Sequence, residues 1–146
     1  MNTDIREKHP NPQFMRRNYE LLNGEWDFCF DNEDVGLKEA YYNNSKWGNN
    51  HTINVPYCYQ SKNSSIGISD SCKVVWYKKL WNLPSNWNNN KNRVLFHIEA
   101  SDYKTTVFIN GSAVGTHEGG HTPFAFDITD FLKEKNNLIA IRVEDE

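Results

Sequence analysis

The dipeptide Asn110-Gly111 lies between two short segments, 103–109 and 112–117, that flank it as the two strands of a hairpin would. Asn-Gly suits the two central positions of a type I′ turn, because both positions need a positive φ. These residues therefore predict a β-hairpin and favour antiparallel sheet.

Alternation of apolar and polar residues, which is the pattern of a strand buried on one face, occurs in other parts of the chain. The other segments with this pattern or with strong β propensity are 26–30, 52–55, 74–83, 93–100, 124–126 and 138–143. Residues 128–133 alone are predicted to form a helical turn, and we expect Asp127 to be its N-cap. Seven or eight short strands with almost no helix predict an all-β antiparallel sandwich, and jelly-roll topology is our choice within that class.

Large aromatic side chains on these segments are interpreted as core residues, because burial of each stabilises a fold by roughly 1.5–3 kcal/mol. They could instead serve as sugar platforms, but their place on alternating strands favours the interior. The five residues concerned are Trp26, Phe28, Trp76, Phe108 and Phe126.

The composition is that of one ordinary folded domain. Of the 146 residues, 38% are hydrophobic and 24% are charged, which is unlike a disordered chain. The formal net charge is -3 and no Lys/Arg-rich run occurs, so we expect no nucleic-acid partner. No apolar run approaches the ~18–20 residues of a membrane span. The charged start has no apolar secretory segment, so we expect a cytoplasmic protein without a membrane partner.

Cysteine and histidine give little sign of a metal or a cofactor. The chain has three widely spaced cysteines, which fit neither a disulfide framework nor a zinc motif: Cys29, Cys58 and Cys72. His117, Glu118 and His121 surround a glycine pair, but their spacing matches no zinc signature. Phosphate-binding and dinucleotide fingerprints are absent. We therefore expect no metal and no cofactor.

Four motifs follow one another along the chain. They are LNGEWDF at 22–28, VP at 55–56 with VWYKK at 75–79, VFINGSAVGTHEGG at 107–120, and TPFAFDIT at 122–129. Together they resemble the sugar-binding domain that opens family 2 glycoside hydrolases, the family of β-galactosidases, β-glucuronidases and β-mannosidases. The resemblance covers 11–143, and it implies a jelly-roll sandwich of the galactose-binding-domain type.

The resemblance also implies how the chain is organised. It implies a sandwich over 21–146 that stops before the last strand of the family's domain, whereas the polar residues of 1–20, with Pro10 and Pro12, themselves suggest an N-terminal arm. A missing neighbour would leave an open sheet edge beside 138–143.

The same resemblance bears on catalysis. Retaining glycosidases need two carboxyl groups about 5–5.5 Å apart, and in this family both lie on a later barrel domain of about 250 residues. We expect this chain alone to be inactive as a glycosidase, to support its own barrel domain and to meet a glycoside substrate only through the longer enzyme.

Two places in the chain are candidates for sugar contact. By resemblance, the loop between Pro56 and Val74 reaches the substrate, and its candidate binding residues are Ile66, Gly67, Ser69 and Asp70. Asp70 could accept hydrogen bonds from sugar hydroxyls or could be a solvated loop carboxylate. Trp87, in an Asn-rich turn, could stack on a sugar ring or pack against its own loop.

Two other functions are compatible with these residues. One is an autonomous carbohydrate-binding module that uses Trp87 or the 56–74 loop. The other is a structural domain that pairs copies of the chain into a homo-oligomer. The sequence does not distinguish galactoside, glucuronide and mannoside as the substrate of the longer enzyme.

Overall fold

The computed structural model describes residues 20–43, 50–55, 73–87, 93–98, 103–119 and 123–145. The predicted N-terminal arm lies almost wholly outside these residues. Contacts within the chain define two compact units. One consists of Met1–Trp26 with Thr52–Asp70, and the other of Asp27–His51 with Ser71–Glu146.

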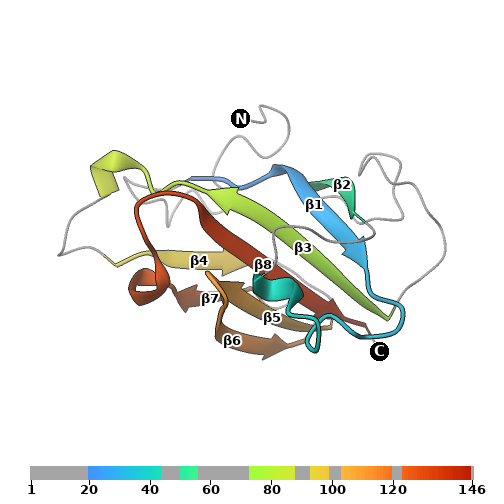
Figure 1. Ribbon diagram of the computed structural model, residues 1–146. Helices are drawn as coiled ribbons and strands as arrows, with labels where there is room; N and C mark the ends of the chain where they lie inside the picture. The colour runs from blue at the N-terminus through green and yellow to red at the C-terminus, as the bar shows by residue number, and fades with distance from the viewer. Residues whose placement is uncertain are drawn as a thin grey trace. The chain divides into compact units, whose positions relative to one another are not determined.

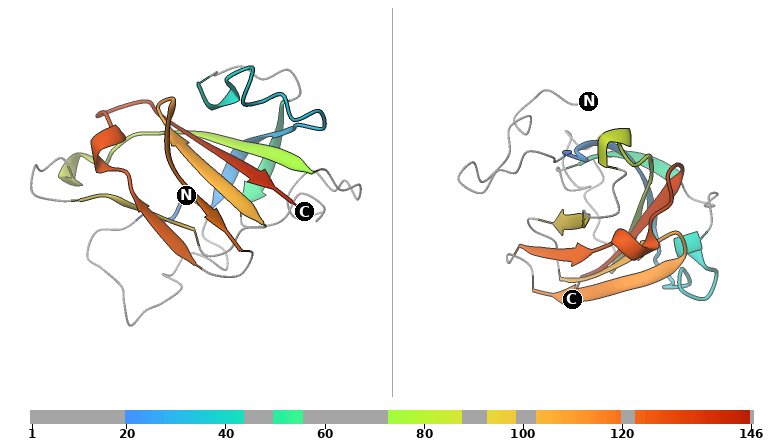
Figure 2. Two further views of the ribbon diagram at one scale, coloured as in Figure 1. Left: turned by 90° about the horizontal axis from the view of Figure 1, so that it is seen from below. Right: turned by 90° about the vertical axis from the view of Figure 1, so that its left-hand side faces the viewer.

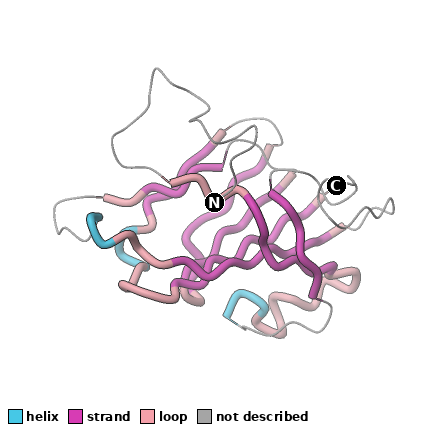
Figure 3. The backbone as a smooth tube through the Cα atoms, turned by 90° about the horizontal axis from the view of Figure 1, so that it is seen from above, coloured by secondary structure: helices cyan, strands magenta, loops and turns pink. Residues whose placement is uncertain are grey.

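The described residues form eight strands and three single-turn 3-10 helices, without an α-helix (Figure 3). The strands are β1 (Gly24–Phe30), β2 (Asn50–Val55), β3 (Val74–Trp81), β4 (Leu95–Ile98), β5 (Lys104–Ile109), β6 (Ser112–Glu118), β7 (Phe124–Asp127) and β8 (Asn137–Glu144). The 3-10 helices are Tyr41–Asn43, Ser85–Trp87 and Thr129–Phe131. The predicted all-β class is confirmed. Within the described part of the chain, no helix is long and apolar enough to cross a bilayer.

The strands form a six-stranded sheet in the order β2-β1-β3-β8-β5-β6 and a two-stranded sheet of β4 and β7. The pairings of β1 with β3, of β3 and β5 with β8, of β5 with β6 and of β4 with β7 are all antiparallel. In Figure 1 the last strand, β8, runs beside β3, and β5 follows it. This is the antiparallel sandwich that the alternation predicts.

The predicted open edge beside 138–143 is wrong. Val143 on β8 pairs with Val75 on β3 and with Thr105 on β5, so this strand has a partner on both sides. In the sheet, β8 lies between β3 and β5, both of which precede it in the sequence. Periodicity gives each strand its faces, but it carries no information on this order.

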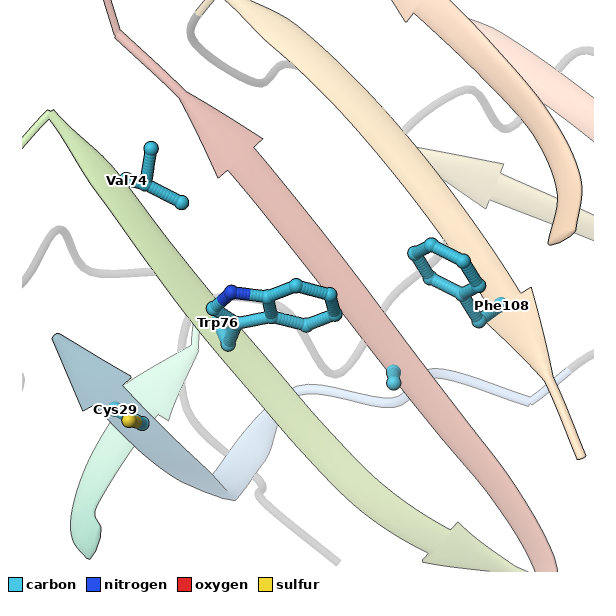
Figure 4. Close-up of a cluster of buried hydrophobic side chains, with 5 residues drawn as sticks. Cys29, Val74, Trp76 and Phe108 are labelled. Atoms are coloured by element: carbon cyan, nitrogen blue, oxygen red, sulfur yellow. The ribbon is translucent and has the colours of Figure 1, made fainter. Parts of the chain in front are cut away.

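The centre of the six-stranded sheet is buried on both faces. On one face, Trp76 of β3 stacks on Phe108 of β5, with ring centroids 5.7 Å apart (Figure 4). This cluster also includes Cys29, Val74 and Ala140, and Tyr41 and Tyr42 pack against it. On the other face, the rings of Phe28 and Tyr77 meet edge to face at 5.1 Å.

The two-stranded sheet packs through β7 against β6. His117 of β6 stacks on Phe124 of β7 with ring centroids 4.1 Å apart, and Gly115 faces the ring of Phe126. Figure 2 shows β4 and β7 as a separate pair of strands. Phe126 is half-buried in this position. The other four predicted core aromatics are buried: Trp26, Phe28, Trp76 and Phe108.

The predicted hairpin forms at Asn110-Gly111. Both residues have a positive φ, 52° and 87°, as a type I′ turn requires. They connect β5 to β6, which pair with a shift in register between Val107 and Phe108. The strongest turn signal in the sequence thus fixes the pairing of these two strands.

Candidate functional site

The candidate sugar-binding residues fall into two groups. Ile66, Gly67, Ser69 and Asp70 lie outside the described residues, and their role stays a prediction. Trp87 is described, at the end of the 3-10 helix Ser85–Trp87 that follows β3.

Trp87 packs against the end of the six-stranded sheet. Its ring meets that of Trp81 on β3 edge to face, with centroids 6.1 Å apart, and its backbone N–H donates to the carbonyl of Pro84. Trp81 is buried, whereas Trp87 is half-buried. Trp87 thus packs on β3 while part of its side chain still faces solvent, and its contact with sugar stays a prediction.

A shallow hollow is lined by the segment that leads to Trp87 and by the turn that precedes β8. Its lining residues are Asn82, Leu83, Ser85, Glu134 and Lys135. Two hydrogen bonds join its sides, from Leu83 N to the carbonyl of Glu134 at 3.2 Å and from Asn136 N to Asn82 Oδ1 at 2.8 Å. Hydroxyl, amide, carboxylate and ammonium groups beside an apolar side chain are groups with which proteins bind small polar ligands.

Asp31 anchors the segment that covers the Trp76 face of the sheet. Its carboxylate is 3% exposed and accepts three hydrogen bonds, from Val35 N and Gly36 N at 2.8 Å each and from Trp76 Nε1 at 3.0 Å. A Cβ at Gly36 would overlap the Trp76 ring, so glycine is needed for this close approach. A buried carboxylate with three donors is a structural anchor.

Arg142 makes a second attachment of the same segment. It lies on β8, is 6% exposed, and pairs with Asp34 at 2.8 Å and Glu144 at 3.3 Å. Its Nε atom is buried and has no hydrogen-bond partner in the part of the chain that the structure describes. Burial alone would lower the pKa of Arg142, but the hydrogen bonds and negative charges of both carboxylates raise it overall. The guanidinium therefore stays charged and holds Asp34 against the sheet.

Sequence reasoning did not identify Asp31, Arg142 or Lys78 as buried groups. Lys78 is buried on β3, and this burial lowers its pKa, partly opposed by Asp27 and Cys29. A signal was present, because Lys78 falls in register with Val74 and Trp76 on an apolar stripe. A long cationic side chain at such a position can bury its stem and bring its charge to a carboxylate.

Asn110 and Asn137 close the end of the sheet. Asn110 Nδ2 donates to the carbonyl of Phe131 at 2.8 Å and to Asn137 Oδ1 at 2.9 Å. Asn137 is fully buried and bonds both the N–H and the carbonyl of Lys133 at 2.8 Å. These two amides hold the 3-10 helix Thr129–Phe131 and the turn after it against the β5–β6 hairpin.

Asp127 binds the first residue of the 3-10 helix Thr129–Phe131, but it is not the N-cap residue that the sequence predicts: Ile128 holds that position, and no side chain caps the helix there. Asp127 is the last residue of β7, and its Oδ1 accepts hydrogen bonds from Thr129 N at 3.0 Å and Thr129 Oγ1 at 2.6 Å. Arg93 donates to Asp127 Oδ2 at 2.9 Å. The hydrogen bonds from Thr129, followed by that from Arg93, lower the pKa of Asp127 to about 2.

The histidine cluster considered for a metal is not assembled by the described residues. His117 stacks on Phe124, and His121 lies outside the described part of the chain. No three histidine, cysteine or carboxylate side chains come together as metal ligands among the residues described. The absence of a metal stays an expectation.

Comparison with known proteins adds independent evidence on this chain. Residues 19–145 match the family model for the glycosyl hydrolases family 2, sugar binding domain. The chain is 32% identical over 128 residues to a beta-galactosidase of Thermoanaerobacter pseudethanolicus, and this alignment covers 86% of this chain and 17% of that protein. It is 30% identical over 133 residues to a beta-glucuronidase of Rattus norvegicus, and that alignment covers 87% of this chain and 20% of the relative.

Solved structures give the same result for the fold. A β-glucuronidase from Ruminococcus gnavus in complex with uronic isofagomine superposes with a TM-score of 0.75 and 27% identity, over 86% of this chain and 21% of that chain. The complex of this enzyme with D-glucaro 1,5-lactone gives a TM-score of 0.70 and 26% identity, over 85% of this chain and 21% of that chain. The chain spans about a fifth of the length of the relatives it matches.

Proposed function

The chain belongs to the sugar-binding domain family of family 2 glycosyl hydrolases, and from this premise we propose that it is the non-catalytic module of a longer glycoside hydrolase. The observation that carries the proposal is the extent of the match. It runs over 19–145 of this chain, yet corresponds to about a fifth of each relative. The relatives are a β-galactosidase and β-glucuronidases, so a β-galactoside or a β-glucuronide is the proposed substrate class of the longer enzyme.

The described carboxylates support a non-catalytic role. A retaining glycosidase needs two carboxyl groups about 5–5.5 Å apart on either side of one glycosidic bond. Here Asp31 holds Trp76, Asp34 holds Arg142, and Asp127 holds Thr129. Each of these acids has a structural partner, so cleavage is assigned to a barrel domain of the longer enzyme.

The module would contribute to the substrate pocket through the 56–72 loop. This loop follows β2 at Val55 and precedes β3 at Val74, two strands of the six-stranded sheet. Strands give a loop fixed ends, and loops on a rigid scaffold commonly carry binding residues. Ile66, Gly67, Ser69 and Asp70 are the residues proposed to reach the sugar, together with groups from the barrel domain.

Calorimetric titration of methyl β-galactoside and methyl β-glucuronide into the purified chain tests this proposal. A module that supplies only part of a pocket should bind no tighter than about millimolar, which corresponds to roughly -4 kcal/mol. Submillimolar affinity for either sugar would contradict it.

A second candidate function is autonomous carbohydrate binding, favoured by the part of the Trp87 side chain that faces solvent, beside a shallow hollow lined by residues of 82–85 and 134–135. Retention of the chain on immobilised polysaccharides is the test. If this function holds, Trp87→Ala abolishes retention and Trp87→Phe keeps it, since an aromatic face remains. Absence of retention, or equal retention of the Trp87→Ala variant, counts against it.

A further inference from the structure

The chain contains two Asn-Gly dipeptides, Asn23-Gly24 and Asn110-Gly111. Asparagine is thermolabile, and glycine after it favours the reaction because no side chain hinders the backbone nitrogen. The glycine nitrogen attacks the asparagine Cγ, a new C–N bond forms, and Nδ2 leaves as ammonia. Water then opens the cyclic succinimide to aspartate or isoaspartate. The two dipeptides are chemically identical, so their surroundings decide which one reacts.

Both polar atoms of the Asn110 carboxamide make hydrogen bonds. Nδ2 donates to Phe131 O and to Asn137 Oδ1, and Oδ1 accepts from Leu138 N at 2.9 Å. The backbone N–H of Asn110 also donates to Leu138 O at 2.9 Å. Rotation of Cγ toward the glycine nitrogen would break these side-chain hydrogen bonds and leave buried groups unsatisfied.

Gly111 is crowded as well. The position that a Cβ would occupy at Gly111 lies 2.9 Å from Oδ1 of Asn43. The Asn110-Gly111 peptide therefore has neither a free carboxamide nor free space in which to rearrange.

Asn23-Gly24 differs in two respects, the partners of the Asn Nδ2 atom and the space at the glycine. The Nδ2 atom of Asn23 is buried and has no hydrogen-bond partner among the described residues, none of which places a heavy atom within 4 Å of the position that a Cβ would occupy at Gly24. Asn23 is half-buried, and Gly24 has a φ of 118°. We propose that Asn23 is the site of spontaneous deamidation in the folded chain and that the hydrogen bonds of Asn110 protect the second dipeptide.

The proposed reaction would alter the start of β1. Trp26 is buried, and its Nε1 donates to the carbonyl of Leu22 at 2.7 Å across the reacting peptide. Isoaspartate at residue 23 inserts one additional backbone atom between these two groups. The hydrogen bond from Trp26 is then broken, and the fluorescence of the aged protein changes in step with the modification.

Ageing of the chain in mildly alkaline buffer, with and without denaturant, tests the proposal. Peptide mapping by mass spectrometry measures conversion at each asparagine. In denaturant the two dipeptides should convert at similar rates. In the folded chain Asn23 should convert readily, whereas Asn110 should convert at least about tenfold more slowly, because its reaction requires local opening. Equal conversion at both positions in the folded chain, or an unreactive Asn23, overturns the proposal.

Two variants separate the causes. Asn23→Ser removes the proposed site and should leave conversion at Asn110 unchanged. Asn137→Ser removes one hydrogen-bond acceptor of Asn110 Nδ2 and should accelerate conversion at Asn110 alone. The comparison of folded and denatured wild-type chain does not depend on either variant folding.

Discussion

Asp31 illustrates how single polar side chains hold this fold together. Its carboxylate lies beneath the segment that it fixes, and its three donors come from two parts of the chain: two backbone N–H groups just after it and the indole of Trp76. Apolar contacts alone would bury Trp76 without fixing the position of the covering segment. The carboxylate gives that segment one specific attachment.

Replacement of Asp31 tests this role. Asp31→Ala leaves the buried N–H donors of Gly36 and Trp76 and the partly buried one of Val35 without an acceptor, and each buried group costs about 1–3 kcal/mol. We expect a loss of about 3 kcal/mol in the free energy of unfolding, measured by urea denaturation. Glu33→Ala, at an exposed position nearby, should change it by less than about 0.5 kcal/mol. Similar values for the two variants would show that Asp31 is no anchor.

Asp127 gives a prediction on pH. Its pKa is about 2 in the folded chain, below the ordinary 3.8, so the ionised form is favoured by folding. The stabilisation is therefore complete above about pH 3.8 and is lost as the pH falls toward 2. Carboxyl-carbon NMR should give this low midpoint. Thr129→Val, which removes the hydroxyl donor, should raise it, and Thr129→Ser should not. An ordinary midpoint in the unmodified chain would refute the assignment.

At the scale of strands, the sequence predicted the faces of the elements well. The Asn-Gly turn and the alternation around Trp26 and Trp76 gave strands close to the observed ones, because period-two patterns follow directly from burial of one face. The insertion of β8 between β3 and β5 was not predictable, since pairing between distant segments depends on how the faces fit together. The burial of Lys78 and Arg142 was missed for a related reason. Lys78 interacts with Asp27, which the alternating pattern of β1 places on the solvent face. Arg142 pairs with Asp34, which lies far from it in the sequence.

The packing of β6 against β7 depends on the small size of Gly115. A Cβ at this position would lie 2.5 Å from the ring of Phe126. Gly115→Ala should lower the free energy of unfolding by about 1–3 kcal/mol through overpacking. Combining it with Phe126→Leu should cost less than the sum of the two single changes, in a double-mutant cycle followed by thermal unfolding. Strict additivity would indicate that the two residues do not press on each other.

At the scale of the whole molecule, the chain has the sheet framework of its family and covers about a fifth of its relatives. The motif order in the sequence was sufficient to identify that family. The candidate site was less accessible to prediction. The 66–70 loop residues are assigned only through the resemblance, and Trp87 turned out to pack on Trp81. An aromatic residue in a polar turn has the same sequence signal whether it binds a sugar or covers a strand.

We propose that this domain folds and supports a glycosidase without cleaving the glycosidic bond itself. The most direct test is hydrolysis of p-nitrophenyl β-galactoside and p-nitrophenyl β-glucuronide by the purified chain, produced in a host that lacks both enzyme activities. Circular dichroism of the same sample should confirm β-structure. We predict no release of p-nitrophenol above the buffer blank. Turnover of either substrate that co-purifies with the folded chain would show that the domain itself cleaves glycosides.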